Sequence, residues 1–227
     1  MQPSGLARRY AAWSLDAVPL LVIACVLCAS SIAEGRLRCA AALAQLADGI
    51  AQALSQMGGM GPTLWSLSHA MLGEPAIAAA AHALAATVLA MLWPPVLVFA
   101  LAGLAFHGAF EASPWQATPG KRWLELRVVD ARGGRVGWPR ALLRHATGIV
   151  SWCSLNLGHV WAAVPPRHVA WHDVIARARV VQVDRCGRLP RWACAWLLLQ
   201  AAIACAALVW LLETTNAALW AAFAGTL

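Results

Sequence analysis

Charged side chains are scarce in this sequence. Asp, Glu, Lys and Arg make up 12% of its 227 residues, whereas 61% of the residues are hydrophobic. A soluble domain carries about 25% charged residues, so these are too few to cover a water-exposed surface. The mean hydropathy of +0.63 points the same way. The composition therefore excludes an ordinary soluble domain and predicts an all-α polytopic membrane protein.

Catalytic signatures are also missing. The sequence contains no G-x-S-x-G, no phosphate-binding Gly-Lys-Ser/Thr loop and no H-E-x-x-H. Its seven cysteines do not form a disulfide framework, because most lie in apolar stretches where Cys behaves as a small hydrophobe. Cys25-x-x-Cys28 has the spacing of a redox or metal motif but lacks a second ligand pair. We expect neither an enzyme nor a cofactor.

A metal site is conceivable where two imidazoles and a carboxylate gather, at His168, His172 and Asp173. No third dedicated ligand is visible for a zinc-type site. Pairing with arginine at the membrane surface suits Asp173 better, since basic residues flank it on both sides. We therefore expect no bound metal.

Four apolar stretches approach the length needed to cross a bilayer. They cover about 11–32, 82–106 (within a longer run from 76 to 110), 145–164 and 192–212. Trp93-Pro94-Pro95 is expected to break or kink the second, because proline removes a helix donor. Glu213-Thr214-Thr215 is expected to end the fourth.

The 17 Lys and Arg residues orient these stretches. Seven lie between the second and third and six between the third and fourth, and none follows Arg191. The positive-inside rule puts both basic segments and the N-terminus in the cytoplasm. The third stretch then has both flanks inside, which favours a re-entrant hairpin turning near Asn156-Leu157-Gly158. Four full crossings are the alternative.

Two Val-rich segments, Trp123–Asp130 and Ala178–Asp184, are predicted to be short strands, with Gly133-Gly134 as a turn after the first. They satisfy each other's backbone groups only if they share a compartment, which supports the hairpin. The segment 34–75 would then lie outside. Cys39, Leu43 and Leu46 begin a three- or four-residue spacing that continues through Ile50 and Leu54 to Met57, typical of an amphipathic helix. Gly58-Gly59-Met60-Gly61-Pro62 is expected to stop that helix.

A buried pair is suggested by Arg9 and Asp16, which lie seven residues apart and so share one face of a helix. A carboxylate at the edge of an apolar run normally has a partner or a function. Thr118-Pro119-Gly120 is turn chemistry, and Lys121-Arg122 after it marks the cytoplasmic boundary of the second span.

Three blocks of this sequence resemble the RDD family of bacterial membrane proteins, named for an arginine and two aspartates. They are LARRYAAWSLD from Leu6 to Asp16, ATPGKRWLELRVVD from Ala117 to Asp130 with the Gly133-Gly134 and Arg140–Arg144 segments that follow, and HDVIARARVV from His172 to Val181. The resemblance implies that Arg9, Asp16 and Asp173 are the naming residues. Arg177 and Ala178 stand where the family usually has Gly and Thr. A transport role has been suggested for the family, without a settled substrate.

The sequence thus predicts an RDD-like membrane domain over 1–184, with 34–75 as an extracytoplasmic insertion, and a C-terminal transmembrane helix with its tail over 185–227. The predicted location is the bacterial cytoplasmic (inner) membrane. The formal charge of +7 fits contact with the anionic head groups of the lipid bilayer rather than with nucleic acid. The candidate polar cluster near the inner membrane surface comprises Arg9, Asp16, Thr118, Gly120, Lys121, Arg122, His172 and Asp173.

Two functions fit this cluster. Asp16 and Asp173 flanking Arg9 or Lys121 could exchange a proton for a cation or small solute, as a proton-coupled transporter requires; so few helices would need a homo-oligomer. The alternative is a structural lock in a non-catalytic scaffold or assembly partner.

Overall fold

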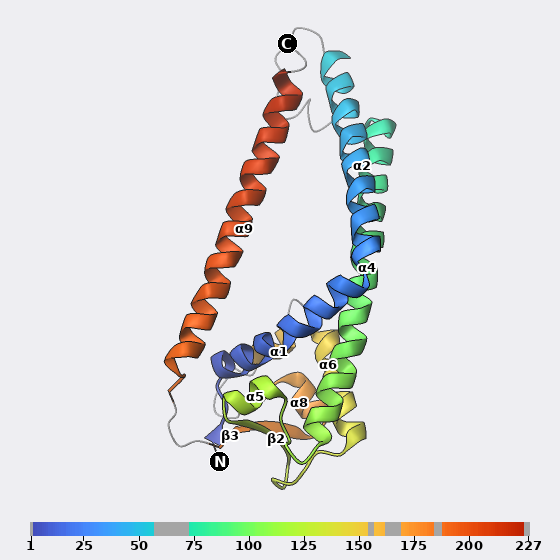
Figure 1. The fold of residues 1–227 in the computed structure, drawn as a ribbon. Coiled ribbons are helices and arrows are strands. Elements are labelled where there is room, and N and C mark those ends of the chain that lie inside the picture. The colour runs from blue at the N-terminus through green and yellow to red at the C-terminus, as the bar shows by residue number, and fades with distance from the viewer. Residues whose placement is uncertain (1, 57–72, 154–156, 162–168, 184–187, 225–227) are drawn as a thin grey trace. The chain divides into compact units, whose positions relative to one another are not determined.

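The computed structural model describes residues 2–56, 73–153, 157–161, 169–183 and 188–224 (Figure 1). Most of them are helical, which confirms the predicted class. The elements in chain order are β1 (Gln2–Pro3), α1 (Leu6–Leu27), α2 (Ala29–Gln56), α4 (Pro75–Ala112), α5 (Pro119–Trp123), β2 (Leu126–Asp130), α6 (Trp138–Cys153), α7 (Leu157–Val160), α8 (Trp171–Ile175), β3 (Ala178–Gln182) and α9 (Arg191–Ala224).

Three of the described helices are long and apolar enough to cross a membrane: α1, α4 and the Arg191–Ala217 part of α9. Within the described residues the stretch 145–164 adds no fourth, because α6 ends at Cys153 and α7 has four residues. The turn predicted at Asn156-Leu157-Gly158 lies partly outside the described residues. Three spanning helices plus a shorter helical segment are therefore confirmed.

The predicted end of the fourth stretch is wrong, and the second stretch does not break at its prolines. Helix α4 continues through Pro94 and Pro95, as proline-containing helices do where neighbouring groups satisfy the freed carbonyls. Helix α9 runs past Glu213 to Ala224. There Thr214 Oγ1 donates to Trp210 O and Thr215 Oγ1 to Leu211 O, both at 2.9 Å. These polar residues satisfy their hydroxyls inside the helix and so do not end it.

The chain divides into two compact units, Met1–Ala24 with Leu97–Ala201, and Cys25–Val96 with Ala202–Leu227. In the second unit α2 packs closely on α4: a Cβ on Gly35 would collide with the Met91 side chain, and one on Gly49 would lie 3.6 Å from Ile77. The predicted amphipathic helix is thus part of α2, which begins earlier, at Ala29. Met57 and the glycine run expected to stop it lie outside the described residues.

A small antiparallel sheet with the order β1-β3-β2 lies in the first unit (Figure 1). Leu126 pairs with Gln182 and Asp130 with Ala178, which confirms the predicted strand pair. The first strand begins at Leu126 rather than Trp123, because the expected Thr-Pro-Gly turn is the start of helix α5. Strand β1 was not predicted. The turn at Gly133-Gly134 is present, with φ +85° at Gly133.

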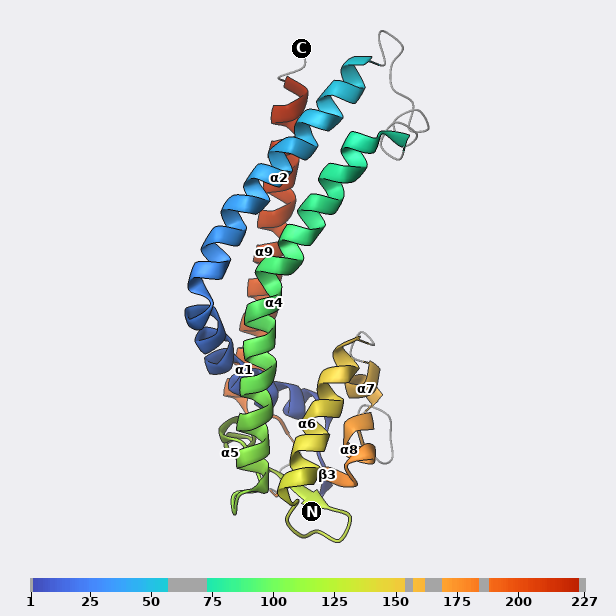
Figure 2. The same cartoon turned by 90° about the vertical axis from the view of Figure 1, so that its right-hand side faces the viewer.

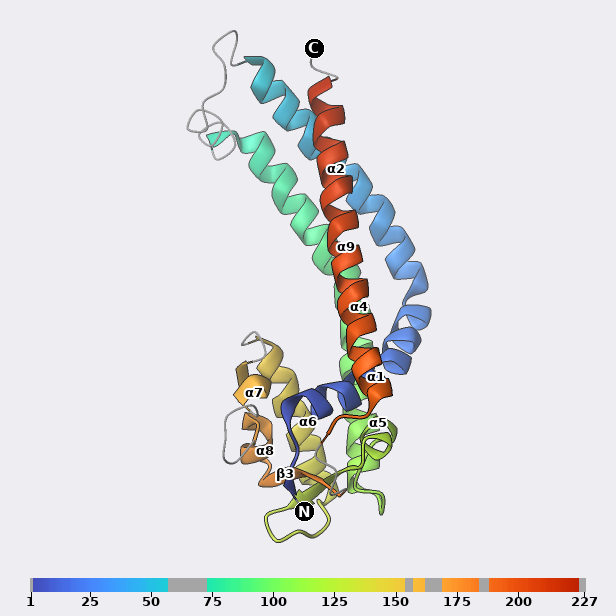
Figure 3. The same ribbon diagram turned by 90° about the vertical axis from the view of Figure 1, so that its left-hand side faces the viewer.

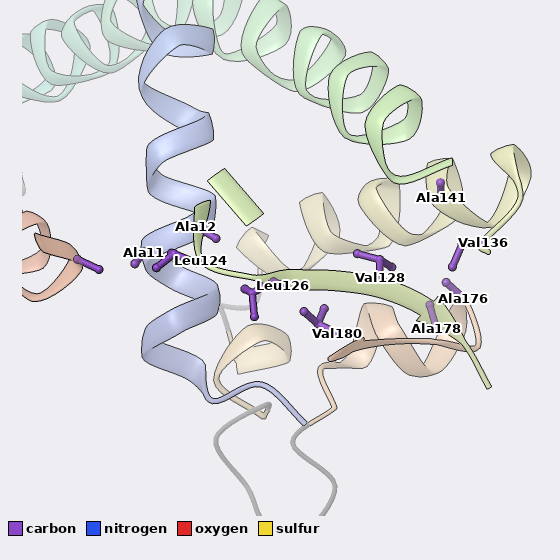
Figure 4. Packing of buried hydrophobic residues seen from close by; sticks show 11 residues of the cluster. Ala11, Ala12, Leu124, Leu126, Val128, Val136, Ala141, Ala176, Ala178 and Val180 are labelled. Carbon is purple, nitrogen blue, oxygen red and sulfur yellow. The ribbon is translucent and has the colours of Figure 1, made fainter. Parts of the chain in front are cut away.

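The core of the first unit lies where α1 crosses the sheet. Figure 4 shows Ala11 and Ala12 of α1 beside Leu124 and Leu126, with Val180 of β3 below them. Alanines let the α1 backbone approach closely. Figures 2 and 3 show α6 alongside α7 and α8 in this unit. The buried face of α6 carries Ala141, Arg144, Gly148 and Ser151 at helical spacing, which aims Arg144 into the unit.

Candidate functional site

Asp16 is bound by the segment that follows α4. Its carboxylate is 3% exposed and accepts hydrogen bonds from Thr118 Oγ1 at 2.5 Å and from Gly120 N at 2.8 Å. Thr118 precedes the first residue of α5 and makes no cap bond of its own. Asp16 therefore takes the place of a capping group for α5, satisfying an amide that the short helix leaves open.

Gly120 is required by this arrangement. A Cβ at this position would collide with the carbonyl oxygen of Ala12 and lie 3.0 Å from the Asp16 carboxyl group. Contact between α1 and α5 therefore depends on a residue without a side chain.

The predicted Arg9–Asp16 pair is wrong. Among the described residues Arg9 makes its ion pair with Asp173, with 2.6 Å between Nη1 and Oδ2. Arg9 also donates to Ser4 O at 3.1 Å and to Val180 O at 3.4 Å. A shared helix face placed both residues toward the core of the unit, but partners from other elements lie closer than they do to each other.

Asp173 is held between two arginines from different helices. It is 0% exposed; Arg9 binds Oδ2, and Arg144 Nε donates to Oδ1 at 2.7 Å. Burial raises the pKa of Asp173, but the nearby positive charges, Arg144 foremost, outweigh it and hold the pKa well below its usual range. This carboxylate stays ionised at any physiological pH.

Glu111, at the end of α4, is a second fully buried acceptor. Lys121 Nζ donates to its Oε1, and Arg144 Nη1 lies 2.8 Å from both of its oxygens. His107, one turn earlier on the same helix, is 3.6 Å away. Sequence reasoning missed Glu111, although an acid and a histidine four residues apart at the end of an apolar run were a signal.

Arg144 connects the two acidic centres. Burial lowers its pKa, but the charges of Glu111 and Asp173 outweigh this and raise the pKa above its ordinary value. Arg144 lies in one of the segments that resemble the family but was not among the predicted site residues. One guanidinium thus joins α6 to both α4 and α8.

The family model of the RDD family matches residues 3–177, a range that contains Arg9, Asp16, Glu111, Lys121, Arg144 and Asp173. The chain belongs to the RDD family. It is similar to the Uncharacterized protein YxaI of Bacillus subtilis (strain 168), with 31% identity over 88 residues. That match covers 39% of the chain and 58% of the relative. No solved structure matches the chain.

Of the remaining predicted site residues of the RDD chain, His172 lies in the charge cluster and Arg122 does not. His172 is buried, with Nε2 3.4 Å from Arg144 Nη2 and from Asp173 Oδ1. Arg122 is exposed and lies over the Trp115 ring, 4.4 Å from its centroid, away from the carboxylates. His168 lies outside the described residues, and the described part of the chain holds no group of three metal-ligating side chains.

The RDD chain departs from the family pattern at a strained position. Arg177, where the family usually has Gly, has φ 51°, a left-handed conformation that glycine adopts without cost. Ala178, where the family usually has Thr, is the first residue of β3.

A cavity of about 790 Å³ borders the cluster within the first unit of the RDD chain. Its polar wall includes Arg9, Lys121 and Arg144. His107, His145 and His172 also line it, and the rings of His107 and His145 stack with centroids 4.4 Å apart. Burial, followed by the adjacent His107 ring, lowers the pKa of His145 to about 2, so this imidazole is neutral.

Proposed function

We propose that the chain is a multi-pass protein of the bacterial cytoplasmic membrane, with its N-terminus in the cytoplasm, that acts as a non-catalytic scaffold or assembly partner. In this proposal the buried charge network is a structural lock. The observation that carries it is that each of the three carboxylates found buried in the described part of the chain is bound by donors from other elements. The family membership and the three apolar helices support the membrane assignment.

The bonds of the lock connect five helices. Asp16 joins α1 to α5, Glu111 joins α4 to α5 and α6, and Asp173 joins α8 to α1 and α6. Removing one partner of a buried pair leaves an uncompensated charge and costs about 3–5 kcal/mol. A network of this kind fixes the arrangement of short elements that have little apolar surface of their own.

Proton-coupled transport of a cation or small solute is the second candidate, and Asp16 favours it. The described donors to this buried carboxylate are a hydroxyl and an amide, not a cation. Glu111 and Asp173 are each held between two cations. Of the buried carboxylates that the structure describes, Asp16 is therefore the one suited to exchange a proton for a cation.

A flux assay in reconstituted vesicles over Na⁺, K⁺ and protons separates the two functions, using wild type, Asp16→Asn and Glu111→Gln. The lock predicts no flux above empty vesicles and loss of folded Glu111→Gln from the membrane. Transport predicts flux in wild type that Asp16→Asn abolishes while the protein stays folded. Flux that depends on Asp16 in a folded variant would reject the lock as the main role.

The orientation is tested by an alkaline phosphatase reporter fused after residue 184, with a matched fusion within 34–75. The reporter is active only outside the cytoplasm. We expect activity from the second fusion and none from the first. Activity after residue 184 would reject the proposed orientation.

A further inference from the structure

The polar wall of the 790 Å³ cavity is one-sided in charge. Arg9, Lys121 and Arg144 line it, whereas the carboxylates that bind them, Glu111 and Asp173, do not. The two acids bind these cations but are not part of the cavity lining. Among the described residues, the charged side chains that line the cavity are therefore cations, with imidazoles beside them. An occupant of the cavity would therefore meet positive charge and N–H donors.

Lys121 is the cation of this wall best placed to hold an anion in the cavity. Its ammonium has three N–H donors, and Glu111 is the acceptor found for it among the described residues. Lys121 is 6% exposed and lines the cavity. By contrast, the N–H donors of Arg144 already bind Glu111, Asp173 and His172.

The rest of the cavity wall is mostly apolar. Leu6, Trp13, Phe99, Ile149 and Leu197 contribute to it. The volume lies within the range of about 300–1,000 Å³ typical of ligand pockets. A bare inorganic anion would leave this apolar surface unused, whereas an alkyl chain would cover it.

We propose that this cavity binds an anionic amphiphile, a phosphate head group on an alkyl chain, with the phosphate on Lys121 and the adjacent imidazoles and the chain on the apolar wall. The source is either a membrane phospholipid or a free alkyl phosphate. The site is independent of whether the chain is a scaffold or a transporter.

The test is calorimetric titration of the purified full-length chain in dodecyl maltoside with dodecyl phosphate. The comparison ligands are inorganic phosphate, which lacks the chain, and dodecyltrimethylammonium, which reverses the charge. We expect one dodecyl phosphate per chain, bound at least about tenfold more tightly than either. Burial of the alkyl chain gives the difference from inorganic phosphate, and the charge-assisted hydrogen bond gives the difference from dodecyltrimethylammonium. Equal binding of dodecyltrimethylammonium, or no binding of dodecyl phosphate by wild type, would overturn the site.

Variants locate the site. Lys121→Gln should lower the affinity at least about tenfold, whereas Arg122→Gln, which removes the neighbouring exposed cation, should leave it unchanged. Ile149→Trp keeps every charge but fills the apolar part, and should also abolish binding; it serves if Lys121→Gln does not fold. Equal losses in Lys121→Gln and Arg122→Gln would show surface attraction only and overturn the proposal.

Native mass spectrometry identifies the source after reconstitution into phosphatidylcholine vesicles with and without phosphatidylglycerol. Phosphatidylglycerol retained on wild type but not on Lys121→Gln identifies a membrane lipid. Dodecyl phosphate binding without retained phosphatidylglycerol identifies a free amphiphile. Either result supports the site.

Discussion

Arg144 bridges Glu111 and Asp173: its Nη1 lies 2.8 Å from both oxygens of Glu111, and its Nε donates to Oδ1 of Asp173 at 2.7 Å. These two acids, one on α4 and one on α8, are 62 residues apart in the chain. The guanidinium is planar and presents its donors in a fixed fork, so it can bind both acids at once. The arrangement of the first unit depends on this residue.

Replacing Arg144 with Lys should destabilise the protein by about 3–5 kcal/mol, because an ammonium cannot bind both carboxylates and one of them is left uncompensated. The measurement is the fraction of protein that stays monodisperse in detergent after heating. Arg140→Lys, on the exposed face of the same helix, is the control and should change little. Equal effects of the two substitutions would contradict the role of Arg144.

Gly120→Ala should cost about 1–3 kcal/mol, the range for overpacking, because its Cβ would collide with Ala12 O and press on the Asp16 carboxyl group. Gly137→Ala is the matched control, since the nearest atom to its Cβ, from Pro139, is 3.9 Å away. Thermal unfolding of both variants in detergent checks the difference. An unchanged Gly120→Ala would show that α1 and α5 are not in close contact.

Arg177→Gly should stabilise the protein by about 0.5 kcal/mol. The left-handed conformation at this position costs an L-residue about 1–2 kcal/mol, and glycine removes that cost. Glycine loses more conformational entropy on folding, which offsets part of the gain. Arg179→Gly, at an exposed position of the extended strand β3, should destabilise instead. Melting temperatures of the two variants should therefore move in opposite directions, and a parallel shift would contradict the strain.

Acid should destabilise the protein through His145. Its pKa is lowered from 6.5 to about 2. Below pH 6.5 this imidazole is therefore protonated in the unfolded chain but stays neutral in the folded chain. The contribution of His145 to the free energy of unfolding is therefore fully present above pH 6.5 and falls by about 1.4 kcal/mol per pH unit below it. The facing groups are His107 and Glu111 on α4, Lys121 on α5 and Arg144 on α6.

His145→Phe keeps a ring beside His107 and removes this titration. Melting temperatures at pH 7 and pH 4.5 should therefore differ less in the variant than in wild type. The window lies above the usual pKa of Asp173, 3.8, so that carboxylate does not contribute there. An identical pH dependence in both proteins would show that His145 is not held neutral.

Several features were predictable because they depend on neighbours along the chain. The apolar runs, the two Val-rich strands and their shared compartment follow from hydropathy, residue type and charge bias. The helix ends were predicted less well: Thr214 and Thr215 bond back to their own helix, and this local bond cannot be distinguished from a stop signal by residue type.

The pairing of charges could not be predicted in the same way. Arg9 and Asp16 do share a helix face, but a helix face has more than one neighbour. Asp16 meets Gly120 because a missing side chain lets α5 come close, and Arg9 reaches Asp173 instead. The spacing of His107 and Glu111 was a signal for a polar site, but it could not show that Lys121 and Arg144 bind this acid.

Residue order alone determined that this protein needs a bilayer, since too few polar side chains exist to face water, and it determined which segments are apolar enough to cross one. Tertiary structure decided which carboxylate each cation binds. Apolar burial is nearly non-directional and can be read from one segment at a time, whereas an ion pair requires two specific atoms within about 4 Å, and only the packing of α1, α4, α5, α6 and α8 brings them together.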